Sequence, residues 1–206
     1  MRKAPPTASN TDRRTLEVIR RLGVARPRDL EQRRIPREYV QRLLKRGALI
    51  RVARGLYSLP DAEISSHRSL AEVAKTTPKG TVCLLSALRY HGLTTQAPAE
   101  IWMALPIHGW RPRSSPFPLR VVYFSGSALT EGVETHEIDG VSVRIYSAAK
   151  TVADCFKYRH KIGPEVAVEA LKDYLKRNRR GADLLWHFAK VCRVTNVIRP
   201  YMEAVG

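Results

Sequence analysis

The stretch from Ala25 to Pro60 constrains the fold more than any other part of the chain, because helix and turn signals follow one another there at short intervals. Pro27 and Pro36 both stand where a helix can begin, since the first helical turn does not use the N–H that proline lacks. The β-branched and aromatic residues after Gly47, interrupted by an Ala-Arg-Gly turn, predict a hairpin. The predicted elements are helices over 27–33 and 36–46 and strands over 49–52 and 56–59. This order of segments predicts a winged helix-turn-helix.

The predicted helix over 36–46 has two chemically different faces. Its apolar residues recur at helical spacing and predict the side that packs on the two preceding helices. A helix over 11–22, which Gly23 ends, supplies the first of these partners. The opposite face is rich in Arg, Lys and Gln, and packing would leave it free to enter a major groove of DNA. The apolar residues are Ile35, Tyr39, Val40, Leu43 and Leu44.

Eight residues of this region are candidates for contacts with double-stranded DNA. Arg and Gln can make bidentate hydrogen bonds to guanine and adenine edges, whereas Lys mainly supplies positive charge. Arginines on the predicted hairpin would reach the phosphate backbone or the minor groove. The simpler alternative is a solvated basic face without a ligand. The candidates are Arg28, Arg37, Gln41, Arg42, Lys45, Arg46, Arg51 and Arg54.

The charge of the chain is large and unevenly distributed. Lys and Arg number 36 against 19 Asp and Glu, a formal net charge of +17. Residues 1–62 hold 16 of these bases and 6 of these acids, so the density of net positive charge there is about three times that of the remainder. Such an excess predicts attraction to polyanions. Arginine enrichment in a high-GC genome is an alternative source of the charge.

The remaining residues predict a second, larger domain. Asp139-Gly140 is a strong hairpin signal, Ser147 is a candidate N-cap, and Pro200 should kink or restart the last helix. The predicted fold class is α+β: a winged helix-turn-helix followed by a mixed α/β C-terminal domain with a small sheet and a helical C-terminal third. We expect a disordered arm over 1–10, a DNA-binding domain over 11–60 and a C-terminal domain over 61–206. The predicted elements are helices over 65–76, 82–91, 148–158, 165–176, 182–192 and 195–205, and strands over 99–105, 119–125, 133–138 and 141–146.

The best enzymatic alternative is a nucleotidyltransferase. Its chemistry would need a Gly-Ser turn that opens a helix to hold phosphate, and two carboxylates on a rigid strand to bind Mg²⁺. Gly126, Ser127, Glu137 and Asp139 match that pattern in part. However, Gly132 should interrupt any helix after Ser127, and the Asp-Gly turn engages Asp139. We therefore expect no enzyme, no catalytic residue and no cofactor.

Other reactive residues favour structural roles. Lys150 and Asp154 are four residues apart on a predicted helix, which is typical of a surface ion pair rather than a catalytic couple. The six histidines have no metal-ligand spacing, and His91 is placed as a helix-end residue. We expect no metal site.

A third hypothesis is RNA binding through the basic second domain. The contact residues would be Trp110, Arg111, Arg113 and the turn over 176–180.

The cysteines and the hydropathy indicate the compartment. Cys83, Cys155 and Cys192 are far apart in apolar helical surroundings, which predicts small buried residues in a reducing compartment. No apolar run approaches the roughly 20 residues that span a bilayer, and the first ten residues lack the apolar region of a signal peptide. We expect a cytoplasmic protein that does not contact a membrane.

Several motifs resemble the AbiEi antitoxin family, the transcription-regulator half of abortive-infection toxin–antitoxin pairs. In the first region they are Asp29-Leu30, then Leu43-Leu44-Lys45-Arg46-Gly47 leading into Arg54-Gly55-Leu56-Tyr57. The more specific motifs are LSALRYHGLTTQ (85–96), IYSAAKTVADCFKYRHKIG (145–163) and ALKDYL (170–175). Two residues depart from the usual pattern. Arg26 replaces a small capping residue, and Arg34 stands where the turn often has Gly.

This resemblance implies an antitoxin with two working parts. The winged helix would bind repeats in its own promoter and repress the operon. The C-terminal domain would counter a nucleotidyltransferase-type toxin, without a stable complex between the two proteins.

Overall fold

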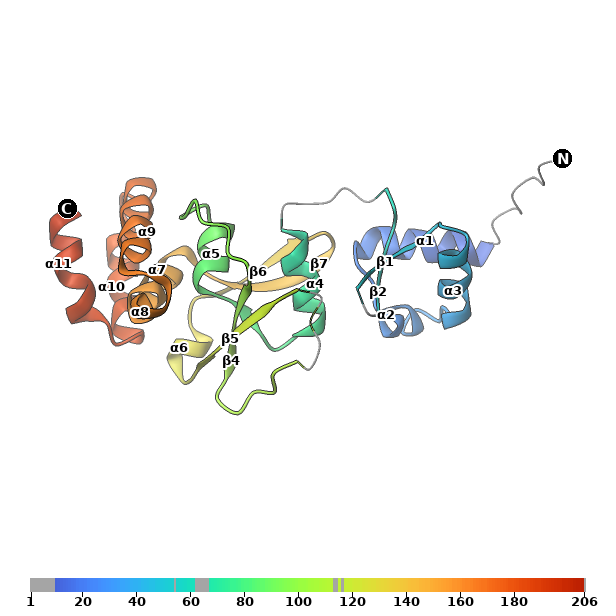
Figure 1. The fold of residues 1–206 in the computed structure, drawn as a ribbon, viewed down its shortest axis with the longest axis horizontal. Helices are drawn as coiled ribbons and strands as arrows, with labels where there is room; N and C mark the ends of the chain where they lie inside the picture. Colours follow the sequence, from blue (N-terminus) through green and yellow to red (C-terminus); the bar gives the residue numbers. More distant parts are fainter. Residues whose placement is uncertain (1–9, 54, 62–66, 113–114, 116, 206) are drawn as a thin grey trace. The chain divides into compact units, whose positions relative to one another are not determined.

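A computed structural model of the chain describes residues 10–53, 55–61, 67–112, 115 and 117–205 (Figure 1). Contacts divide this part into two compact units. The first contains the described residues up to Lys75 together with Glu137–Ser142; the second contains Thr76–His136 and the residues from Val143 onward. Residues 1–9 of the expected arm over 1–10 lie outside the described residues, as do the candidates Arg54 and Arg113, whereas Asn10 belongs to the first helix. The predicted domain boundaries stay a prediction.

The first unit has the predicted order of helices and strands (Figure 1). Its three N-terminal helices enclose a core to which Ile19, Leu30 and Leu43 contribute, each almost inaccessible to water. The hairpin is antiparallel, with Ile50 paired to Ser58, and the Ala25–Tyr57 bridge joins it to the residues before the second helix. The elements are α1 (Asn10–Leu22), α2 (Pro27–Glu31), α3 (Arg37–Lys45), β1 (Ile50–Ala53), β2 (Leu56–Ser58) and α4 (Arg68–Thr76).

The turn between α2 and α3 explains why glycine is common there. Arg34 has φ 60°, the left-handed region in which a side chain is disfavoured. The turn nevertheless closes, because the Arg34 N–H donates to the Glu31 carbonyl and the Ile35 N–H donates to the Leu30 carbonyl. The departure from the family pattern therefore places local strain in the turn without preventing it.

The second unit is built on a five-stranded sheet with the order β5-β4-β3-β7-β6. The predicted strands β6 (Val133–Ile138) and β7 (Val141–Tyr146) are confirmed, and β4 (Ile101–Pro106) and β5 (Leu119–Phe124) begin or end within two residues of the prediction. The central strand β3 (Thr81–Val82) was not predicted: residues 82–91 were assigned to one helix, whereas the helix α5 is Leu84–Tyr90. The two elements form one continuous apolar run, so hydropathy alone cannot divide them.

The C-terminal third is helical, as predicted. Ser147 caps α7, since its hydroxyl accepts from the Lys150 N–H at 3.3 Å. The last helix is continuous across Pro200, so it does not restart there, and the alternative of a kink at Pro200 stays a prediction. These helices are α7 (Ala148–Lys157), α8 (Arg159–Ile162), α9 (Pro164–Arg177), α10 (Ala182–Val191) and α11 (Thr195–Val205), and a four-residue helix, α6 (Ser127–Thr130), precedes β6.

The predicted α+β class is confirmed by this architecture of helices, hairpin, mixed sheet and helical end. The three cysteines are buried and unpaired, as predicted, and burial raises the pKa of the Cys83 and Cys155 thiols. Within the described residues, no helix combines the length and hydropathy needed to cross a membrane.

Candidate nucleic-acid interface

The exposed face of α3 collects most of the predicted DNA-contact residues. Glu38, Gln41 and Lys45 lie at the centre of that face, since positions three and four apart share one side of a helix. Arg42 and Arg46 lie along its edge. These five side chains line one shallow hollow on the surface. The structure thus brings four of the eight predicted residues together at this hollow.

Asp12, in the first turn of α1, holds both arginines of that edge. One carboxylate oxygen accepts from Arg42 and the other from Arg46, the latter at 3.1 Å. Asp12 is 1% exposed, whereas the side chains of Arg42 and Arg46 are each 39% exposed. The hydrogen bond to Asp12 raises the pKa of Arg42. Sequence reasoning missed Asp12, because an acid in a first helical turn is ordinary and nothing in the sequence links it to residues 30 and 34 positions away.

Tyr39 completes the arrangement around Arg42. Its ring centroid lies 4.3 Å from the guanidinium carbon, so the flat cation stacks on an aromatic face. The guanidinium is therefore held on its face by Tyr39 and on one edge by Asp12. The Arg42 side chain nevertheless remains 39% exposed, so a ligand can still reach it.

The other contact residues that the structure describes lie outside this hollow. Arg28 is exposed on α2, and Arg51 is exposed on β1. Arg37, at the start of α3, donates to the carboxylate of Glu31 across the turn. Both side chains of that pair are exposed to solvent, which limits its effect on stability.

Arg26, which replaces the small capping residue of the family pattern, is accommodated at the start of α2. The Arg26 N–H donates to the Asp29 carboxylate at 2.9 Å, and its guanidinium donates to the Lys75 carbonyl. Lys75 Nζ also donates to Asp29, at 3.1 Å. Burial alone would raise the pKa of Asp29, but these hydrogen bonds outweigh it and lower that pKa. The side chain at position 26 therefore anchors α2 to α4, a role that a small cap could not fill.

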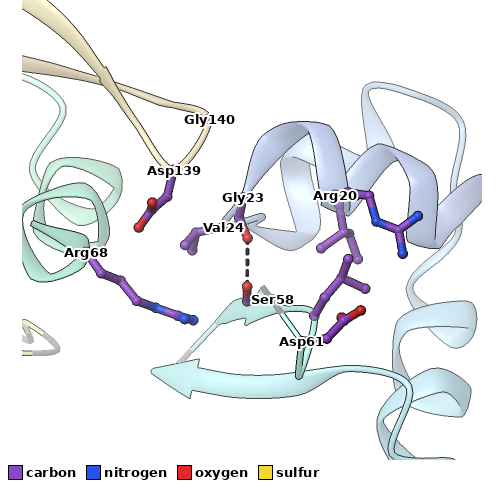
Figure 2. A pocket seen from close by; sticks show the side chains of 10 residues that line it. Arg20, Gly23, Val24, Ser58, Asp61, Arg68, Asp139 and Gly140 are labelled. Carbon is purple, nitrogen blue, oxygen red and sulfur yellow. Dashed lines mark hydrogen bonds between the residues drawn. The ribbon is translucent and has the colours of Figure 1, made fainter. Parts of the chain in front are cut away.

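A pocket also lies within the first unit, and Figure 2 shows its lining. Two of its polar residues are engaged in structure: the Ser58 hydroxyl donates to the Gly23 carbonyl at 2.8 Å, and Arg68 donates to Glu72 at 2.9 Å. Its other walls combine apolar side chains with charged ones: Ile19, Val24, Leu59, Arg20, Asp61 and Asp139. We assign no ligand to this pocket.

The residues of the nucleotidyltransferase hypothesis lie in turns and short elements. Gly126 precedes α6, which is only four residues long and ends before Gly132, as expected. Asp139 is in the β6–β7 turn with φ 48°, also as expected, and Glu137 is an exposed residue of β6. Among the described residues, no group of three or more His, Cys, Asp or Glu is placed to hold a metal ion.

The expected surface ion pair of Lys150 and Asp154 requires a correction. The two residues do pair, with Lys150 Nζ 2.7 and 2.6 Å from the carboxylate oxygens, but they are 0% and 1% exposed. The prediction of a surface location was wrong: α5, α9 and α10 pack against α7, and Lys150 Nζ lies 4.9 and 4.3 Å from the ring centroids of Phe124 and Tyr146. Cys192 also donates to Asp154, at 3.1 Å.

His91 ends α5 as predicted, and its Nε2 donates to the Tyr146 carbonyl at 2.7 Å.

The residues of the RNA-binding hypothesis are separately placed. Trp110 is 74% exposed in the loop after β4, and Arg111 is engaged with the Leu119 carbonyl at 3.2 Å. The turn over 176–180 is exposed.

Comparisons with known proteins concern the fold of the chain and the family of its N-terminal segment. The chain resembles the crystal structure of the RV2827C protein from Mycobacterium tuberculosis, with a TM-score of 0.53 and 17% sequence identity over 96% of this chain and 78% of that chain. At such identity the likeness concerns the fold. No curated protein sequence matches the chain. Residues 13–60, which run from α1 to the end of the wing, match the family described as "Transcriptional regulator, AbiEi antitoxin", and the resemblance to that family of regulators is confirmed over this segment.

Proposed function

We propose that this protein is a DNA-binding transcriptional regulator that acts as the antitoxin of an AbiE-type pair. In this proposal the winged helix binds operator repeats in its own promoter, represses the operon and performs no catalysis. The observation that carries the proposal is the exposed face of α3, where Gln41, Arg42, Lys45 and Arg46 lie together. That face belongs to the segment that matches a regulator family.

The chemistry of α3 suits the reading of a DNA major groove. Gln41 can pair with adenine and an arginine fork with guanine, while Lys45 neutralises phosphate. Arg28 and Arg51, on neighbouring elements, and Arg54 would add contacts to the backbone. Arg37 shares its guanidinium with Glu31 and would bind phosphate when that exposed pair opens.

Two variants of neighbouring residues test the proposal most directly. Gln41→Ala should reduce binding to the promoter repeat by roughly 1–3 kcal/mol while leaving binding to random DNA nearly unchanged, because it removes a base contact. Lys45→Ala is the matched control one helical turn away. It should weaken both DNAs alike and lower the slope of log K against log salt by about one.

Fluorescence anisotropy with the promoter fragment and a scrambled duplex, measured across a salt series, provides both quantities. Equal losses on both duplexes for Gln41→Ala would remove α3 from the role of reading helix. Gln41 is preferable to Arg42 for this purpose, because Arg42→Ala also removes a partner of Asp12.

The antitoxin role is tested separately in cells. We propose that the C-terminal domain counters a nucleotidyltransferase-type toxin without a stable complex. A reading frame of that type beside this gene should arrest growth when expressed alone, and co-expression of this chain should restore growth. Restoration by the Gln41→Ala variant would assign the countering activity to the remainder of the chain, and failure of the wild type to restore growth would contradict the antitoxin role.

A further inference from the structure

The acid at the edge of α3 is an unusual neighbour for a surface that attracts phosphate. Asp12 places a negative charge directly against two of the basic residues of that surface, and it is 1% exposed. A carboxylate there reduces the local positive potential. Asp12 lies on a face rich in basic residues, so its location there needs an explanation other than attraction of DNA.

The geometry of the cluster provides one. Arg42 and Arg46 are one helical turn apart, and each takes one oxygen of the same carboxylate. The ring of Tyr39 lies against the flat face of Arg42 at 4.3 Å. A guanidinium held on its face and on one edge has lost most of its rotational freedom before any ligand arrives. Ordering a long side chain costs roughly 0.5–1.5 kcal/mol at an interface, and this arrangement avoids that cost upon binding.

We infer that Asp12 is a specificity-determining positioning residue, which orients Arg42 and Arg46 so that the partly exposed side chain of Arg42 faces a guanine edge. This inference rests on the proposed DNA-binding function of α3. Asp12 does not touch the DNA in this arrangement; it acts through the two arginines. Asp12 therefore affects DNA affinity in two opposite ways. Its charge lowers attraction to any DNA, and its hydrogen bonds orient a base contact that favours one sequence.

The substitution Asp12→Asn separates these two effects by sign. Loss of the negative charge should tighten binding to a scrambled duplex roughly twofold, the Coulomb energy of one charge about 10 Å from phosphates in water. Loss of the fixed arginine orientation should weaken binding to the promoter repeat. The ratio of the two affinities should then fall about 5- to 150-fold, the range of one bidentate base contact.

Two control variants distinguish charge from position. Glu17→Gln removes the same charge from the same helix, but Glu17 pairs with Arg21 on an exposed surface of α1. It should change both affinities alike and leave their ratio intact. Asp12→Glu keeps the charge but displaces the carboxylate by one methylene, so it should lower the ratio without tightening binding to scrambled DNA.

The positioning itself can be measured without DNA. In ¹⁵N NMR spectra of the full-length protein, the guanidinium signals of Arg42 and Arg46 should report hindered rotation in the wild type and free rotation in Asp12→Asn. The thermal unfolding midpoint, measured in parallel, shows whether the variant is folded; if Asp12→Asn unfolds, Asp12→Glu provides the test.

The outcomes are distinct. A wild-type protein that binds promoter and scrambled DNA equally would overturn the proposed function and this inference with it. A wild-type preference that persists unchanged in folded Asp12→Asn and Asp12→Glu would overturn the inference alone. Equal weakening on both duplexes would assign Asp12 a purely structural role, which also contradicts it.

Discussion

Each unit of the protein contains an acid almost completely removed from water, and the two differ in what covers them. Asp12 is covered by Arg42 and Arg46, whose own side chains remain 39% exposed. Asp154 is covered by the surrounding helices, and its partner Lys150 is 0% exposed. The first arrangement delivers positive charge to a surface, whereas the second encloses both charges. Burial of the acid alone therefore does not indicate its role; the exposure of its partner does.

The largest effect should come from breaking the enclosed pair. Lys150→Met leaves Asp154 without its cation in a buried site, and such a loss typically costs about 3–5 kcal/mol of stability. Burial already raises the pKa of Asp154, with Lys150 opposing the shift. The double variant Lys150→Met/Asp154→Leu should recover most of this loss, because two apolar groups of similar size need no partner.

Tryptophan fluorescence during urea unfolding measures this loss of stability in the unit that contains Lys150 and Asp154. All three tryptophans, Trp102, Trp110 and Trp186, belong to the second unit. Asp173→Asn is the matched control, since Asp173 and Arg177 form an i,i+4 pair of the same spacing with both side chains exposed. It should cost roughly 0–1 kcal/mol. A double variant no more stable than Lys150→Met would contradict this account of the pair.

A smaller effect is expected at the surface cluster. Arg42→Ala opens a path for water to Asp12, so the acid becomes solvated instead of remaining in a dry site. The stability of α1 and α3 should fall by less than in Lys150→Met. The loss should shrink further in about 0.5 M NaCl, where the Debye length is roughly 4 Å. Hydrogen exchange of amides in α1 and α3, with and without salt, provides the measurement. A salt-independent loss as large as that of Lys150→Met would mean that both clusters are enclosed.

The two clusters also mark what the sequence could and could not predict. The spacing of Lys150 and Asp154 predicted their pairing, because i,i+4 contact is local geometry. Their burial was not predicted, because it depends on how the other helices pack around α7. In α3, periodicity correctly separated the buried Val40 and Leu43 from the exposed Gln41. The contact with Asp12 joins two helices far apart in the sequence, and no periodicity reports such a contact.

The short buried strand β3 was not predicted from the sequence, for a related reason. The strand β3 occupies two residues in the middle of the sheet and leads directly into α5. Central strands and buried helices both lack polar alternation, so the run from Val82 was assigned to one helix. The hairpin of β6 and β7 was located to the residue, since Asp139-Gly140 fixes both its turn and its register.

The smallest predicted effect concerns a histidine of the second unit and tests whether its enclosed polar groups respond to pH. Burial lowers the pKa of His91; Glu134 and the hydrogen bond to the Tyr146 carbonyl oppose that shift, and His136 reinforces it. A carbonyl can only accept, so Nε2 carries a proton in the neutral ring, and acid must place the second proton on Nδ1.

The direction of the pH dependence follows from that lowered pKa. Just below the unfolded pKa of about 6.5 the unfolded chain binds more protons than the folded one, so stability is fully present above that pH and declines as the pH falls. In His91→Gln, whose amide can still donate to Tyr146, the urea midpoint should change less between about pH 7.5 and 5.5, the range in which histidine titrates. His160→Gln, at an exposed position on α8, should keep the wild-type pH dependence. An identical pH dependence in His91→Gln and the wild type would show that His91 keeps its unfolded affinity for protons, and that the interior of the second unit is more polar than its burial indicates.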